Sequence, residues 1–236
     1  MRWIFTLCLF LTSFLSALDI GVVQLTIESV NENDKTLVLS PSDQEVLVGE
    51  TGIIVHKISS GIISNSITIT EVQSDKILAK YEKFTLLEQK YLPTPIIKPK
   101  TGDEVVLRSF YSRGFIVAPN QKIYDAIKTL YPKIHFVSSD LLIADVGGKG
   151  IIDPSKKGFK ELCKIYSVGL IAIYASNGVN LLDCQSFEVL ERNALENPEP
   201  KEMMYPLFAR VEAKSFWDFL RPKKDYFKEY DKLLSK

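Results

Sequence analysis

Short apolar runs separated by turn residues dominate the first half of the chain. Residues 22–28, 36–39, 53–56, 66–72, 76–81 and 105–107 each have the length and the apolar or β-branched composition of a strand. Segments rich in Asn, Asp, Gly and Ser separate neighbouring runs, as turns do. Many short strands at near-regular spacing are typical of a small barrel or sandwich. The pattern therefore predicts a β domain over residues 18–113.

The pattern changes near residue 114, where strands begin to alternate with helices. After a buried type of strand, Ile123, Ile127 and Leu130 repeat with helical periodicity, which predicts a helix. Asn120 precedes this helix and has a side chain suited to cap it. Further strands are expected at residues 134–137, 169–174 and 179–184, with short helices between them. Strands that alternate with short helices indicate an α/β domain. We place it at residues 114–192.

Residues 193–236 are expected to contain a linker, a strand at residues 207–211 and a C-terminal helix. Pro198 and Pro200 mark the linker. From Ser215 onward, aromatic and aliphatic residues recur along one side of an expected amphipathic helix, with a break at Pro222. The whole chain is thus predicted to have a mixed α+β fold: an N-terminal small β-barrel or sandwich, a small α/β domain and a C-terminal amphipathic helix.

The first seventeen residues have the pattern of a secretory signal peptide. Arg2 is followed by a short apolar run and by the small-residue sequence Leu15-Ser16-Ala17. The run is shorter than the roughly 20 residues that cross a membrane as a helix, which disfavours the alternative of an uncleaved anchor. We therefore expect an exported protein with no transmembrane helix after signal cleavage, either in the periplasm or at the outer-membrane-associated cell surface.

Charge and cysteine content narrow the classes of partner. Lys and Arg together number 29, as do Asp and Glu, and this balance argues against a nucleic-acid partner, which needs a basic surface. Removal of the signal would leave Cys163 and Cys184. In an exported chain they could form a disulfide, or they could be two buried thiols, since Cys is often buried. Sequence alone leaves both alternatives open.

Recognisable catalytic patterns are absent from the sequence. His56 and His135 each lie inside an expected strand, without the spacing of a zinc site. There is no Gly-x-Ser-x-Gly nucleophile motif, and the glycine-rich segment at residues 147–150 lacks the Ser or Thr of a phosphate-binding loop. We therefore predict a protein that is not an enzyme and has no cofactor or metal. An exported enzyme of an unrecognised type is the alternative.

Lysines recur every four residues at the C-terminus, at Lys224, Lys228, Lys232 and Lys236. On a helix this spacing places them along one face, which is most often simply a solvated face. Lys236, as the last residue of the sequence, would also present an ammonium and an α-carboxylate together. A receptor pocket with a cation site, an anion site and an apolar wall can bind both groups.

Five segments carry a resemblance to a known family: LLEQKYLPT (86–94), KTGD (100–103), FIVAPNQKIY (115–124), DLL (140–142) and VGLI (168–171). They resemble the N-terminal domain of a bacterial plasminogen-binding protein family found in Helicobacter and Campylobacter relatives. The resemblance implies a surface or envelope protein that captures host plasminogen, whose kringle domains recognise lysine. The position that corresponds to a recognised terminal lysine is Lys236, with Lys232 and Lys228 as internal candidates.

An alternative function is that of a periplasmic scaffold or assembly factor in an envelope machine such as the flagellar motor. In that case the partners would be envelope proteins. The aromatic side of the C-terminal helix, with Phe216, Trp217, Tyr226 and Tyr230, would dock on such a partner, because aromatic residues anchor many interfaces.

Overall fold

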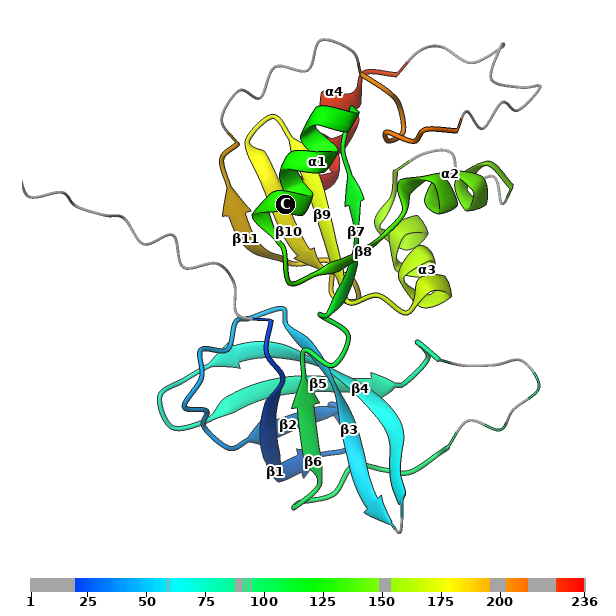
Figure 1. The fold of residues 1–236 in the computed structure, drawn as a ribbon. Helices are drawn as coiled ribbons and strands as arrows, with labels where there is room; N and C mark the ends of the chain where they lie inside the picture. The colour runs from blue at the N-terminus through cyan, green and yellow to red at the C-terminus, as the bar shows by residue number, and fades with distance from the viewer. Residues whose placement is uncertain are drawn as a thin grey trace, which may run out of the picture.

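The computed structural model describes residues 20–58, 60–87, 91, 93, 95–148, 154–195, 203–211 and 224–235. The predicted signal peptide, residues 1–17, and Lys236 lie outside the described residues. A barrel and a helix-covered sheet follow one another along the chain (Figure 1). The predicted mixed fold is confirmed, and its first part is a closed barrel, not a sandwich.

The barrel contains six strands: β1 (Val23–Asn31), β2 (Thr36–Leu39), β3 (Thr51–Ile58), β4 (Ser60–Val72), β5 (Ile77–Lys83) and β6 (Glu104–Leu107). They close in the order β1-β2-β5-β4-β3-β6, with antiparallel pairing throughout. Successive side chains of a strand lie on opposite faces. In β1, Val23, Leu25 and Ile27 are therefore buried in the barrel core, while Gln24 and Thr26 between them are exposed.

The second half begins with β7 (Arg113–Val117), α1 (Gln121–Leu130), β8 (His135–Val137), α2 (Ser139–Gly148) and α3 (Lys156–Tyr166). It continues with β9 (Leu170–Ala175), β10 (Gly178–Asp183), β11 (Val189–Asn193) and α4 (Tyr226–Leu234). The sheet order is β11-β10-β9-β7-β8, where β7 is parallel to β8 and β9 and the other pairs are antiparallel. Asn120 caps α1 as predicted, because its side chain accepts a hydrogen bond from the Ile123 amide.

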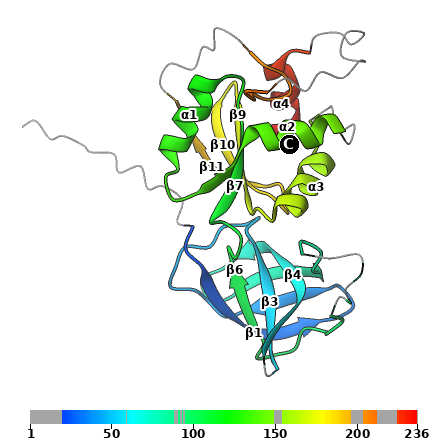
Figure 2. The ribbon, with the colours of Figure 1, turned by 45° about the vertical axis from the view of Figure 1, so that its right-hand side comes forward.

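Helices cover both faces of this sheet (Figure 2). Ile116 of β7 packs in one cluster with Ile123 and Ile127 of α1. Phe115 and Val117 point to the opposite face, where they pack with residues of α2, α3 and α4. The three helices α2, α3 and α4 therefore share one layer, and α1 forms the other.

One predicted strand is not formed. Residues 203–211 contain no strand, although Leu207 and Ala209 are buried against the sheet. The amide of Phe208 donates to the carbonyl of Ala118, just after the end of β7. Apolar alternation was enough to bury this segment, but the contact does not continue into a hydrogen-bonded ladder. Conversely, β11 was not predicted, because its sequence VLERN is largely polar.

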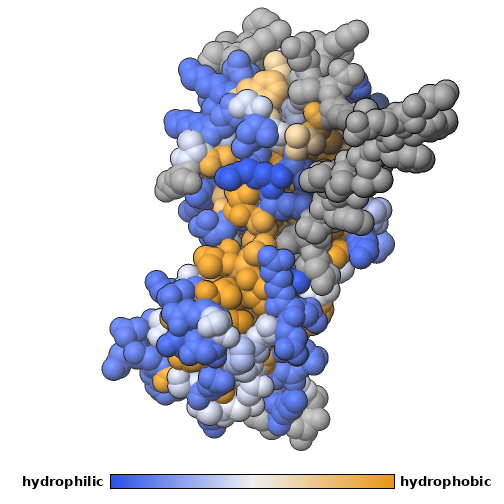
Figure 3. All heavy atoms as spheres, turned by 90° about the vertical axis from the view of Figure 1, so that its left-hand side faces the viewer, coloured by the Kyte–Doolittle hydropathy of each residue, from blue (hydrophilic) through white to orange (hydrophobic). Residues whose placement is uncertain are grey.

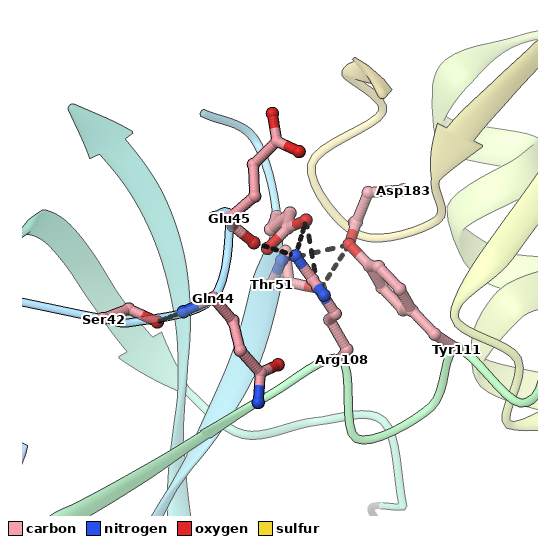
Figure 4. Close-up of polar contacts among 8 residues, drawn as sticks. Ser42, Gln44, Glu45, Thr51, Arg108, Tyr111 and Asp183 are labelled. Atoms are coloured by element: carbon pink, nitrogen blue, oxygen red, sulfur yellow. Dashed lines mark hydrogen bonds and ion pairs between the residues drawn. The ribbon is translucent and has the colours of Figure 1, made fainter. Parts of the chain in front are cut away.

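Buried polar side chains join the barrel to the second half (Figure 4). Asp183, at the end of β10, accepts hydrogen bonds from the amide and hydroxyl of Thr51 at 3.1 and 2.6 Å and from the Tyr111 hydroxyl at 2.7 Å. Beside them, the Arg108 guanidinium forms a buried ion pair with Glu50 at 2.8 Å. The contact between Thr51 and Asp183 connects residues 132 positions apart in the chain, and the contacts Tyr111–Asp183 and Arg108–Glu50 connect residues 72 and 58 positions apart. Apolar surface also gathers where the two halves meet, as seen from the side (Figure 3).

Candidate functional site

The helix α4 carries Lys228 and Lys232, two of the lysines that the sequence singled out. It begins after Asp225, whose side chain accepts a hydrogen bond from the Lys228 amide at 3.0 Å and caps the helix. The helix is amphipathic, with Tyr226 and Tyr230 on its buried side. The packing of this buried side determines which residues the other side presents to solvent.

The buried side of α4 is held by two tyrosines. The Tyr226 hydroxyl lies 3.1 Å from the Val117 carbonyl and 3.0 Å from the Tyr174 carbonyl, so that it can donate to the ends of two strands. The Tyr230 hydroxyl donates to the Pro206 carbonyl at 2.6 Å. Burial raises the pKa of both hydroxyl groups well above the usual value. The helix is thus fixed to the sheet by neutral tyrosines that remain protonated at physiological pH.

A third contact fixes the rotation of α4. Asp231 accepts a hydrogen bond from the amide of Ser176 at 3.0 Å, in the turn between β9 and β10. Together with Tyr226 and Tyr230, this contact prevents α4 from rolling on the sheet. The exposed face of the helix is therefore a defined surface.

The exposed face of α4 presents Lys228 and Lys232 to solvent. None of the ion pairs formed within the described part of the chain involves either ammonium group. Glu229 lies between them and is partly exposed. The described surface therefore offers two lysines and a carboxylate side by side, while Lys236 lies outside the described residues.

The prediction that Tyr226 and Tyr230 dock on an envelope partner is wrong. The two side chains are 1% and 0% exposed, because they complete the core of their own domain. Phe216 and Trp217, the other two residues of that prediction, lie outside the described residues. An amphipathic pattern identifies the apolar side of a helix without identifying what covers it.

The structure also assembles an acid, an imidazole and a hydroxyl inside the barrel. The Nε2 atom of His56 lies 2.6 Å from Ser64 Oγ, and its Nδ1 atom lies 2.9 Å from Asp103 Oδ2. Sequence analysis missed this cluster because its members lie on β3, on β4 and before β6. The arrangement of Asp103, His56 and Ser64 resembles the acid, base and nucleophile of a serine hydrolase triad. However, Ser64 is 2% exposed and donates its hydroxyl hydrogen to Asn65 Oδ1 at 2.6 Å.

We interpret the His56 cluster as structural. Buried polar groups require hydrogen-bond partners, and these side chains satisfy one another at the end of an apolar barrel core. A nucleophile must reach its substrate, whereas Ser64 is enclosed by its neighbours. The second histidine, His135 on β8, is exposed and lies in the other half of the molecule, so the two histidines do not form a common site.

A hollow at the junction is lined mostly by uncharged residues, including Ile53, Phe84, Phe110 and Gln185. Among its described lining residues, Tyr111 is the one with a titratable side chain, and its hydroxyl already donates to Asp183. The hollow therefore brings together no acid–base pair. Across the described residues, no group of three His, Cys, Asp or Glu side chains is arranged to hold a metal ion.

Cys163 on α3 and Cys184 after β10 lie against each other in the core. Their Cα atoms are 6.1 Å apart and their sulfur atoms are at bonding distance, which is the arrangement of a disulfide. Such a bond attaches α3 to the sheet and closes a chain separation of 21 residues.

Within the described residues, no helix has the length and apolar character needed to cross a bilayer.

Comparison with known proteins identifies the family. A family model described as the N-terminal region of plasminogen-binding protein pgbA matches residues 22–234. The chain belongs to this family. The match includes the barrel, the helix-covered sheet and all of α4.

Two curated relatives support this assignment, and both are named plasminogen-binding protein PgbA. The protein from Helicobacter pylori strain J99 is 35% identical over 198 residues, which cover 81% of this chain and 43% of the relative. The protein from strain 26695 is 33% identical over 220 residues, which cover 91% of this chain and 48% of the relative. This chain thus spans a little under half of the length of the relatives that it matches. No solved structure matches it.

Proposed function

We propose that this pgbA-family chain is an exported, non-enzymatic protein that binds host plasminogen through lysines of its C-terminal helix. The names of the two curated relatives support plasminogen as the partner. The observation that carries the proposal is the exposed face of α4, where Lys228 and Lys232 form none of the ion pairs within the described residues. Lys236 is proposed as a third contact.

The chemistry of the face suits a lysine-binding receptor. Such a receptor recognises a cation together with an anion, as in the free amino acid. On α4, Glu229 precedes Lys232 by three residues, which places the two side chains on one helix face. The two groups form no ion pair with each other within the described chain, so both charges remain open to a partner. A helix fixed by Tyr226 and Tyr230 presents them with little loss of conformational freedom.

A partner from the host requires that the protein leave the cytoplasm. The proposed signal peptide at residues 1–17 provides the route, and it ends before the first described strand. The mature protein would then reside in the periplasm or at the outer-membrane-associated cell surface. Protease treatment of intact cells distinguishes the two, because only a surface protein is cleaved while the cells remain closed.

Surface plasmon resonance on immobilised plasminogen tests the binding mechanism. Wild-type protein should bind, and a soluble lysine analogue should displace it. The double variant Lys228→Gln/Lys232→Gln should bind at least tenfold more weakly, and removal of Lys236 should weaken binding further. The matched control is Lys122→Gln/Lys128→Gln, which removes two exposed lysines from α1 on the opposite face of the sheet.

Two results would refute the proposal. One is wild-type binding that the lysine analogue does not reduce. The other is equal loss of binding in the α4 variant and in the α1 control, because a general charge effect would then account for the interaction.

A further inference from the structure

The lysine face of α4 has a counterpart on α3. Residues 159–164 of α3 read Phe-Lys-Glu-Leu-Cys-Lys, and residues 227–232 of α4 read Phe-Lys-Glu-Tyr-Asp-Lys. The shared pattern is Phe-Lys-Glu-x-x-Lys, which we name the FKExxK motif. It places two lysines one helical turn apart with a glutamate beside them.

Two apolar positions of the motif face the core in both copies. In α3, Phe159 and Leu162 are 5% and 1% exposed. In α4, Phe227 is partly buried and Tyr230 is 0% exposed. All four side chains pack in or against one apolar cluster, so the first and fourth positions of both copies face it. The fifth position differs, since Cys163 is buried on α3 and Asp231 is half-buried on α4.

The charged positions of the motif are correspondingly outward in both helices. On α3, Glu161 is exposed and Lys160 and Lys164 are partly exposed. As on α4, neither lysine takes part in an ion pair within the described residues. The second copy thus offers the same two cations and one anion to a partner.

The charge pattern of α3 is unfavourable for the isolated helix. Lys156, Lys160 and Lys164 follow one another at four-residue intervals, and like charges at this spacing destabilise a helix. Only Glu161 among the eleven residues of α3 is acidic. The helix is held instead by its buried side, where Cys163 lies against Cys184. The lysine row is therefore not what stabilises α3, and its charges can interact with a partner.

The two copies lie on neighbouring helices. The rings of Phe159 and Tyr230 are 6.4 Å apart, and α3 and α4 occupy the same layer of the sheet (Figure 2). A partner with more than one lysine-binding domain could therefore engage both helices. The second contact would then be intramolecular, which strengthens binding without any change in either site.

We infer that the FKExxK motif of α3, with Lys160, Lys164 and Glu161, is a second binding site for a lysine-recognising kringle domain, equivalent to the site on α4. This inference rests on the proposed function, because it assumes that the α4 motif binds a kringle. It adds a second site on a different helix and predicts a stoichiometry of two.

Isothermal titration calorimetry with an isolated lysine-binding kringle domain tests the inference. The full wild-type chain should bind two kringles. The variant Lys160→Gln/Lys164→Gln should bind one, as should Lys228→Gln/Lys232→Gln, and the combined variant should bind none. The α1 variant Lys122→Gln/Lys128→Gln is the control for charge and should still bind two.

Intact plasminogen provides a second readout. Loss of either motif should weaken its binding by at least tenfold, since one of two linked contacts is removed. The single change Glu161→Gln should abolish the α3 site, because the receptor needs the anion as well as the cation. Circular dichroism should show an unchanged fold for these surface variants.

The possible failures are distinguishable. If wild-type protein binds one kringle and the α3 variant also binds one, the second site does not exist, while the proposed function stands. If wild-type protein binds no kringle, both the proposed function and the second site are wrong. If the α3 variant binds one kringle and the α4 variant still binds two, the α3 site stands and the assignment to α4 is wrong.

Discussion

At the junction, Asp183 is fully buried and accepts five hydrogen bonds, two from Thr51 and one each from Tyr111, Gln185 and Ser186. On α4, Lys228 is exposed and forms none of the ion pairs within the described residues. A buried charge without partners is costly, so the junction charge is committed to the fold. An exposed charge contributes little to stability and remains open to other molecules. Changes at the junction should therefore affect stability, and changes on α4 should affect binding.

The largest effect is expected from Asp183→Asn. The NH2 group would replace one of the two acceptor oxygens and direct its hydrogens toward backbone N–H donors, so that the hydrogen bonds to that oxygen would be lost. We predict a decrease of about 3–5 kcal/mol in the free energy of unfolding, measured by urea titration. The control variant Asp125→Asn alters an exposed carboxyl group on α1. It should change the free energy of unfolding by less than about 0.5 kcal/mol. Similar stability for the two variants would contradict a structural role for the junction.

The next largest effect is expected at Cys163 and Cys184. If they form a disulfide in the mature protein, replacement of both by Ala should lower the free energy of unfolding by about 3 kcal/mol, because the loop that the bond closes is released in the unfolded chain. A reducing agent should lower the stability of wild-type protein and leave the double variant unaffected. Alkylation of two free thiols in the native protein would instead establish the buried-thiol alternative.

A smaller effect is expected from Tyr226→Phe, which removes the hydroxyl that reaches the Val117 and Tyr174 carbonyl groups. We predict a loss of about 1–2 kcal/mol, measured by denaturant titration at pH 7.

The same variant has a predicted pH signature. Burial raises the pKa of Tyr226, so the folded protein keeps this proton while the unfolded chain loses it near pH 10. The unfolded state then binds fewer protons, and stability falls as the pH rises above about 10. The fall should be shallower in Tyr226→Phe. An equal slope for both proteins would show that Tyr226 is not buried as described.

The smallest effect on stability is expected from Lys228→Gln/Lys232→Gln. Exposed lysines at these positions should contribute less than about 0.5 kcal/mol, so the thermal transition should stay near that of wild type. The affinity of this double variant for plasminogen should nevertheless fall by at least tenfold. The reverse pattern, lower stability with unchanged binding, would remove the contrast between the junction and the helix surface.

Much of the fold could be predicted because local patterns specify it. Alternating apolar residues in β1 and the cap at Asn120 act within a few residues, and both predictions are confirmed. The apolar pattern at residues 207–211 gave a wrong strand prediction because it is also a purely local signal. It correctly indicates burial, but a strand also needs a partner edge along its length, which lies elsewhere in the chain.

Less of the candidate site could be predicted. Four-residue spacing singled out Lys228 and Lys232, and their exposure agrees with a solvated helix face. The same analysis assigned Tyr226 and Tyr230 to a partner, because it could not show that the sheet of the same domain covers them. It also overlooked α3, whose Lys160 and Lys164 become relevant only beside α4.

The sequence by itself determined the succession of strands and helices, the spacing of the lysines and the family resemblance. These follow from short-range geometry and from residue identity. The tertiary structure alone decided which aromatic side chains are buried, that Asp183 meets Thr51 and Tyr111, and that α3 and α4 share one layer. The physical reason is that these contacts join residues far apart in the chain, whose proximity depends on the packing of the whole domain.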